Sequence, residues 1–207
     1  MNVKPFMSLI GTMLAAALIL GACDASSTQT ESHEPSAPAS AVSPAPTPTA
    51  VVDSADAERP DWFGFEMTDV RTGQSFTIDD YADKVVLLET MAIWCPTCRK
   101  QADEVKRLHE ILGDSEDLVS ISLDVDMGED AETLKAYAER FGYAWHFAVA
   151  PLLVARALGN QYSAQYLNPP VAPMLVIDRD GNVLGLPFGS VKSAEALQGV
   201  VEPLLDA

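Results

Sequence analysis

The stretch Trp94-Cys95-Pro96-Thr97-Cys98 decides the fold and the chemistry expected of this chain. It follows an apolar run and precedes apolar residues at helical spacing, so both cysteines are expected on the first turn of a helix. Two thiols at this spacing lie close enough to form a disulfide. Unpaired backbone N–H groups and the helix dipole at this position stabilise an anion, which favours the nucleophilic thiolate of Cys95. The stretch therefore predicts a thiol redox site.

A Cys-x-x-Cys pair also occurs as one half of a zinc site. Zinc prefers four ligands, and no second such pair follows in the sequence. The three histidines, His33, His109 and His146, are widely separated, and His146 is expected to be a packed or surface residue. Redox chemistry is therefore favoured over a structural metal or inert cysteines. We expect that neither a metal nor an organic cofactor is needed.

Residues 1–22 have the features of an export signal. Lys4 precedes a largely apolar run, Leu9 to Leu20, which is short for a membrane span. Small residues then precede Cys23, as in a bacterial lipobox, where the cysteine is lipidated and becomes the mature N-terminus. The alternative is a plain signal peptide with a coincidental cysteine. Lipidation is favoured because Cys23 stands at the required place, and it is supported by the cysteine count, since Cys95 and Cys98 then remain as an isolated pair.

Residues 23–60 are rich in Ala, Ser, Thr and Pro and contain little apolar surface to bury. This composition predicts a disordered linker that tethers a folded domain to a membrane, or a spacer of no particular length. The net charge of the chain is −17, which argues against nucleic acid as a partner. It favours solubility, and it is compatible with basic partner surfaces.

Residues 61–207 are expected to form one α/β domain, in which an N-terminal β-hairpin turns at Arg71-Thr72-Gly73. The alternation of apolar patterns predicts a mixed central sheet with helices on both faces. The expected strands are residues 62–67, 75–78, 85–91, 119–125, 145–149, 174–177 and 183–186, and the expected helices begin near residues 96, 130, 152 and 193. Residues 79–82 are expected to form a turn, and residues 162–168 are ambiguous. Cys95 then follows the carboxyl end of a strand, where such sheets place their chemistry.

The helix after Cys95 carries one apolar stripe, to which Cys98, Ala102, Val105 and Leu108 belong. This periodicity predicts that Cys98 is buried and that Cys95 is exposed at the tip of the helix.

Glu89 interrupts the otherwise apolar strand 85–91. A carboxylate in such a strand is costly unless it is paired or neutral. Glu89 either faces solvent or is a buried acid near the dithiol. Burial would raise its pKa, so that it could exchange protons with Cys98.

Residues 60–207 resemble the thioredoxin superfamily. They look most like the membrane-tethered, extracytoplasmic TlpA/ResA/DsbE-like thiol-disulfide oxidoreductases. The resemblance rests on the Trp94 to Cys98 stretch after a buried strand, and on Pro173 just before the later strand 174–177. The sequence Asp178-Arg179-Asp180-Gly181 after that strand also fits.

The resemblance implies a role for each matching residue. Cys95 is the nucleophile and Cys98 the resolving thiol, while Glu89 occupies the position of the buried acid of thioredoxin. Pro173 corresponds to the cis-proline packed against the dithiol, and Ala172 before it would offer backbone hydrogen bonds to a substrate chain.

The resemblance also implies that Trp94, Pro96 and Thr97 contact the substrate. Its partners would be proteins with disulfides and a membrane thiol reductant that recycles the dithiol. The Pro96-Thr97 pair resembles that of DsbE-type proteins of cytochrome c maturation. Gln101 and Asp103, however, stand where those relatives often carry Glu and Pro.

Four other functions are compatible with this fold. A peroxiredoxin needs a peroxidatic cysteine set among Pro, Thr and Arg, which the Cys-x-x-Cys stretch does not match. A copper chaperone of this fold favours wider cysteine spacing and a later histidine, which are not visible here. A haem chaperone or a redox-inactive binding module remains the alternative to an enzyme.

Overall fold

The computed structural model describes residues 59–113 and 115–207. The expected export signal, Cys23 and nearly all of the expected linker lie outside these residues. Within the described part, no helix is both long enough and apolar enough to cross a membrane.

A five-stranded mixed sheet forms the centre of the domain, as the sequence predicted. Its strands are, in spatial order, β5 (His146–Val149), β4 (Leu118–Asp124), β3 (Val85–Met91), β6 (Met174–Ile177) and β7 (Val183–Gly185). Strand β3 runs parallel to β4 and antiparallel to β6. All seven residues of β3 are buried, which explains why its sequence is almost continuously apolar.

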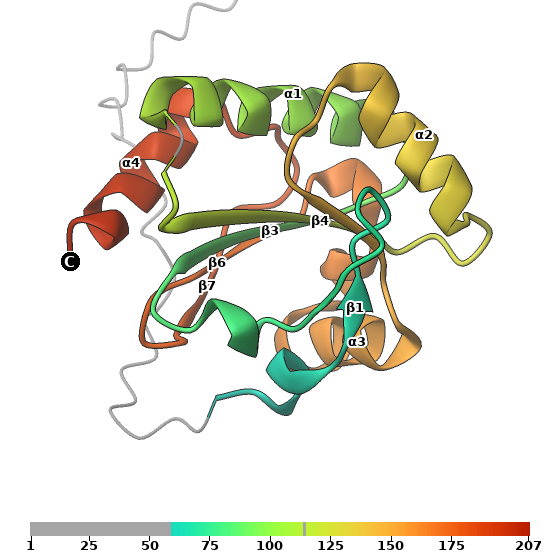
Figure 1. Ribbon diagram of the computed structural model, residues 1–207, viewed down its shortest axis with the longest axis horizontal. Coiled ribbons are helices and arrows are strands. Elements are labelled where there is room, and N and C mark those ends of the chain that lie inside the picture. Colours follow the sequence, from blue (N-terminus) through green and yellow to red (C-terminus); the bar gives the residue numbers. More distant parts are fainter. Residues whose placement is uncertain (1–58, 114) are drawn as a thin grey trace, which may run out of the picture. The chain divides into compact units, whose positions relative to one another are not determined.

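Helices cover both faces of this sheet (Figure 1). One face packs against α1 (Pro96–Leu112), α2 (Ala131–Phe141) and α4 (Ala194–Leu205). The other face is covered by α3 (Leu152–Ala157) and by the segment that precedes β3. This layered arrangement confirms the fold class expected from the alternating pattern.

The ends of α2 follow from local chemistry. The Asp130 carboxylate accepts a hydrogen bond from the Thr133 backbone N–H at 2.8 Å and caps the first turn. Gly142 ends the helix with φ = 66°, a left-handed conformation that glycine adopts without steric cost. The beginning of the helix agrees with the prediction.

The N-terminal hairpin consists of β1 (Met67–Thr68) and β2 (Ser75–Phe76), which form a separate two-stranded sheet. The expected strand over residues 62–67 is wrong at its beginning, because residues Asp61–Gly64 form a 3₁₀ turn. Trp62 and Phe63 are both fully buried in one cluster, with ring centroids 4.7 Å apart. A strand would have pointed these neighbours to opposite faces.

The ambiguous region near residues 162–168 forms short helical turns. They are a π-helical turn at Leu158–Tyr162 and 3₁₀ turns at Ala164–Leu167 and Pro169–Val171. The last of these turns packs against α1 and so reaches the two cysteines.

Candidate active site

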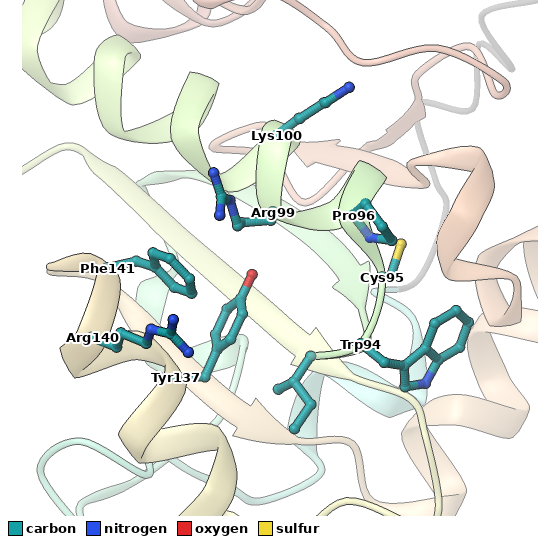
Figure 2. Close-up of a pocket in the computed structure, with 9 residues that line it drawn as sticks. Trp94, Cys95, Pro96, Arg99, Lys100, Tyr137, Arg140 and Phe141 are labelled. Atoms are coloured by element: carbon teal, nitrogen blue, oxygen red, sulfur yellow. The ribbon is translucent and has the colours of Figure 1, made fainter. Parts of the chain in front are cut away.

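Cys95 caps the N-terminus of α1, with Pro96 as its first residue (Figure 2). The Cys95 Sγ accepts a hydrogen bond from the Cys98 backbone N–H at 3.2 Å, and both thiols are free. Proline suits this position because it has no N–H that would be left unpaired. The structure therefore confirms that both cysteines lie on the first turn of the helix, beyond the carboxyl end of β3.

Both thiols are buried, so the expectation that Cys95 is exposed is wrong. Cys95 is 1% exposed and Cys98 is 2% exposed, and they share one apolar cluster with Met91 and Ala92. The exposed residue at this tip is instead Trp94, at 57%. Cys95 still borders an open pocket of about 420 Å³ between α1 and α2.

Cys98 lies against the Pro169–Val171 turn. Its Sγ donates to the Pro169 carbonyl oxygen at 3.4 Å. Burial raises the pKa of the Cys98 thiol, and the hydrogen bond with Cys95 raises it further. Cys98 therefore needs a proton acceptor before it can act as a nucleophile.

Glu89 is buried and does not face solvent. It shares a face of β3 with Leu87 and Met91, which pack in the same cluster as the two cysteines. The register of β3 and β4 sets it opposite Ser122, whose Oγ donates to Glu89 Oε1 at 2.5 Å. Burial raises the pKa of Glu89 to about 7, against the lowering effect of this hydrogen bond. Glu89 is thus a buried acid on the dithiol side of the sheet, poised to titrate near neutral pH.

Lys192, whose charge acts on Glu89, was not assigned from the sequence, and Gln101 was noted only as a departure from the relatives. The Lys192 Nζ donates to the Ala172 carbonyl oxygen, and burial lowers the pKa of Lys192 to about 8 while the charge of Glu89 opposes this shift. The buried Gln101 side chain accepts from the Lys192 N–H at 2.8 Å and donates to its C=O at 3.1 Å. Gln101 lies three residues after Cys98 on the apolar stripe, and this was a signal for its burial.

The chain before β6 differs from the expectation. All peptide bonds of the described residues are trans, so the cis bond implied for Pro173 is absent. Ala172 has φ = 49°, and its N–H donates to the Pro169 carbonyl oxygen at 2.9 Å while its own carbonyl accepts from Lys192. Both backbone groups of Ala172 are therefore engaged within the chain, and in this conformation they are not open to a substrate.

An acidic loop between β4 and α2 holds the residues just before Cys95. The Trp94 Nε1 donates to Asp126 Oδ2 at 2.6 Å, and the Ile93 N–H donates to Glu129 Oε2 at 2.9 Å. Burial and the hydrogen bond with Glu129 raise the pKa of Asp124 to about 8. These acidic residues were not assigned a role from the sequence, although several of them follow the same predicted strand closely.

The remaining candidate residues lie away from the dithiol or on its rim. His146 contacts the Tyr81 hydroxyl at 2.9 Å and the Asp69 carboxylate at 3.4 Å, so it is a packed residue. Pro96 is exposed and Thr97 is half-buried. Within residues 59–113 and 115–207, no cluster of three or more His, Cys, Asp or Glu could hold a metal ion.

Comparison with known proteins agrees with this geometry. Thiol-disulfide oxidoreductase ResA of Geobacillus kaustophilus is 28% identical over 127 residues, which cover 61% of this chain and 67% of that protein. The crystal structure of a thioredoxin-family thiol:disulfide interchange protein from Chlorobium tepidum is similar, with a TM-score of 0.57 and 22% identity over 73% of this chain and 99% of that one. A secreted thiol-disulfide isomerase from Corynebacterium glutamicum has a TM-score of 0.55 and 19% identity, over 69% of this chain and 84% of that one. Residues 45–198 match the Redoxin family, and the chain therefore belongs to this family, with a thioredoxin-like fold.

Proposed function

We propose that this thioredoxin-like thiol-disulfide oxidoreductase reduces protein disulfides outside the cytoplasm through Cys95 and Cys98. The observation that carries the proposal is the unlinked thiol pair on the first turn of α1, where the Cys95 sulfur accepts a backbone N–H. A helix N-terminus stabilises a thiolate at this position, and the thiolate is the form that attacks a disulfide.

In the first step, the Cys95 thiolate attacks one sulfur of the substrate disulfide. A mixed disulfide forms between Cys95 and the substrate, the substrate disulfide breaks, and the released substrate thiolate takes up a proton. In the second step, Cys98 loses its proton and attacks the Cys95 sulfur. The Cys95–Cys98 disulfide forms, the bond between Cys95 and the substrate breaks, and the second substrate thiolate leaves and takes up a proton, so two electrons have passed to the substrate.

Glu89 is the proposed proton acceptor for Cys98. The raised pKa of Cys98 makes deprotonation the difficult part of the second step. An acid with a pKa of about 7 is partly ionised near neutral pH and can accept that proton. Lys192, whose backbone is held by Gln101, would stabilise the ionised form of Glu89 by its positive charge.

No metal or organic cofactor enters these steps. The oxidised domain would be returned to the dithiol form by a membrane thiol reductant. The export signal and lipobox expected around Cys23 favour a lipid anchor on the outer face of a bacterial membrane, and the secreted relative supports an extracytoplasmic location. Apocytochrome c is one candidate substrate, since the Pro96-Thr97 pair resembles that of DsbE-type proteins.

The test is the reduction of insulin or of a disulfide-bonded peptide by the reduced protein. Wild type should be much faster than Cys95→Ser, and Cys98→Ser should accumulate a mixed disulfide with the substrate that is stable to electrophoresis without reductant. If wild type is no faster than Cys95→Ser, the proposed activity is refuted.

The direction of electron flow needs a separate measurement, the reduction potential of the Cys95–Cys98 pair. A potential near that of thioredoxin, about −270 mV, agrees with a reductase, whereas one near about −120 mV would identify an oxidant.

A further inference from the structure

We infer that the pocket beside Cys95 binds an acidic side chain of the substrate polypeptide, next to the cysteine that is attacked. This inference rests on the proposed function and names the class of substrate that the site prefers. The pocket is walled by Ile93, Trp94, Cys95, Pro96, Arg99, Lys100, Tyr137, Arg140 and Phe141. The thiol that forms the mixed disulfide therefore borders the same space as three cations.

Two of the three cations, Arg99 and Arg140, lie against one aromatic ring, that of Phe141. The Arg99 guanidinium carbon lies 5.0 Å from the ring centre of Phe141, and that of Arg140 lies 5.3 Å from it. In Figure 2 the two guanidinium groups, one from α1 and one from α2, flank Phe141, and Lys100 extends away from them. Stacking on the ring holds both groups in place and leaves their N–H donors available.

These cations are little neutralised by the protein itself. Arg99 approaches the Asp103 carboxylate only at 3.9 Å, with both side chains about half exposed. Within the described part of the chain, neither Lys100 nor Arg140 forms an ion pair. The pocket is thus a positive site on a chain of net charge −17.

Beside Ile93 and Trp94, two other walls of the pocket, the loop between β4 and α2 is acidic. There the Trp94 indole is bound to Asp126, and Glu129 binds the backbone N–H of Ile93. Figure 2 shows Trp94 on the far side of Cys95 from Arg140 and Phe141. A substrate chain that crosses Cys95 therefore meets positive charge at Arg99 and Arg140 and negative charge beside Trp94, which selects both an acidic residue and the orientation of the chain.

A carboxylate suits this pocket better than other groups. Guanidinium groups bind carboxylates through paired N–H donors, and the apolar walls, Ile93 and Pro96, can cover the methylene groups of Glu. A basic or neutral side chain at the same place would gain no charge pairing.

The test compares three peptides that contain one disulfide and differ only at the residue beside the attacked cysteine, which is Glu, Gln or Lys. With the reduced full-length protein at low ionic strength, kcat/KM for the Glu peptide should exceed that for the Gln peptide about fivefold. At about 1 M NaCl, where the screening length is about 3 Å, the ratio should fall towards one.

Two substitutions on α2 provide a matched comparison. Arg140→Gln should reduce the Glu-to-Gln ratio to about twofold or less. Lys135→Gln removes the same charge from an exposed position of the same helix outside the pocket, and it should keep the wild-type ratio. Arg140→Glu should reverse the preference, so that the Lys peptide becomes the better substrate. Circular dichroism of each variant checks that the fold is kept.

Equal kcat/KM values for all three peptides in wild type would refute the inference while leaving the proposed function intact. An equal loss of the ratio in Arg140→Gln and Lys135→Gln would also refute it, because the effect would then come from net charge alone. If wild type reduces no peptide faster than Cys95→Ser does, the proposed function itself fails.

Discussion

The buried carboxyl group of Glu89 should make the folded protein less stable as the pH rises from about 4.5 to about 7. The pKa of Glu89 is raised from 4.5 to about 7 in the folded protein, mainly by burial. Between these values the folded state holds a proton that the unfolded state has released. The contribution of protonated Glu89 to the free energy of unfolding is therefore complete below pH 4.5, the pKa of Glu89 in the unfolded chain. It is lost as the pH rises through about 7, the pKa of Glu89 in the folded protein. Across this range the free energy of unfolding falls by about 3 kcal/mol, because each pKa unit between the folded and unfolded states corresponds to about 1.36 kcal/mol.

Glu89→Gln removes this titration and keeps an oxygen that can accept the hydrogen bond from Ser122. The free energy of unfolding of the variant minus that of wild type should therefore increase by about 3 kcal/mol between pH 4.5 and 7. Asp124, whose pKa is also raised, titrates in both proteins and cancels in the difference. Lys192 titrates mainly above this range, at about 8.

The measurement is urea-induced unfolding of the reduced proteins, followed by tryptophan fluorescence at several pH values. Glu66→Gln is the matched control, because it makes the same change at an exposed position. A difference for Glu89→Gln that varies by less than about 1 kcal/mol would show that Glu89 titrates normally, and the proposed role as acceptor for Cys98 would lose its basis.

Two further substitutions test the surroundings of the dithiol by the same unfolding assay. Gln101→Ala should cost about 2 kcal/mol, because it leaves the N–H and C=O of Lys192 without the partners that Gln101 supplies, and a loss below about 0.5 kcal/mol would contradict this. Tyr137→Phe should change the free energy of unfolding by less than about 0.5 kcal/mol or increase it, because the buried Tyr137 hydroxyl has no hydrogen-bond partner within residues 59–113 and 115–207. A loss above about 1 kcal/mol would mean that this hydroxyl is satisfied.

Local patterns were the reliable part of the prediction. The helix after Cys95, the cap at Asp130 and the strand Val85–Met91 all agree with the structure. The helix and the strand have apolar patterns that can be read within a few residues, and the Asp130 side chain accepts a backbone N–H of the next turn. The error at Trp62 arose because an aromatic pair can be buried by a tight turn as well as by a strand.

The burial of Cys95 depended on segments that the local pattern does not contain. The helical stripe placed Cys98 in the core correctly, and it also put Cys95 outside that core. In the structure both cysteines join one cluster, and the Pro169–Val171 turn reaches Cys98 from 71 residues away. Loops that converge from distant parts of the chain have no periodicity that would reveal their meeting.

The sequence by itself determined that two thiols occupy the start of a helix after a buried strand, and that Glu89 interrupts this strand. These facts follow from spacing and from the cost of burying a carboxylate. Only the tertiary structure decided what surrounds them. The β3–β4 register brings Ser122 to Glu89, Gln101 holds Lys192 across 91 residues, and the chain enters β6 through a trans bond before Pro173. Strand register and loop convergence depend on how all layers pack together, so these partners became visible only once the sheet and its helices were assembled.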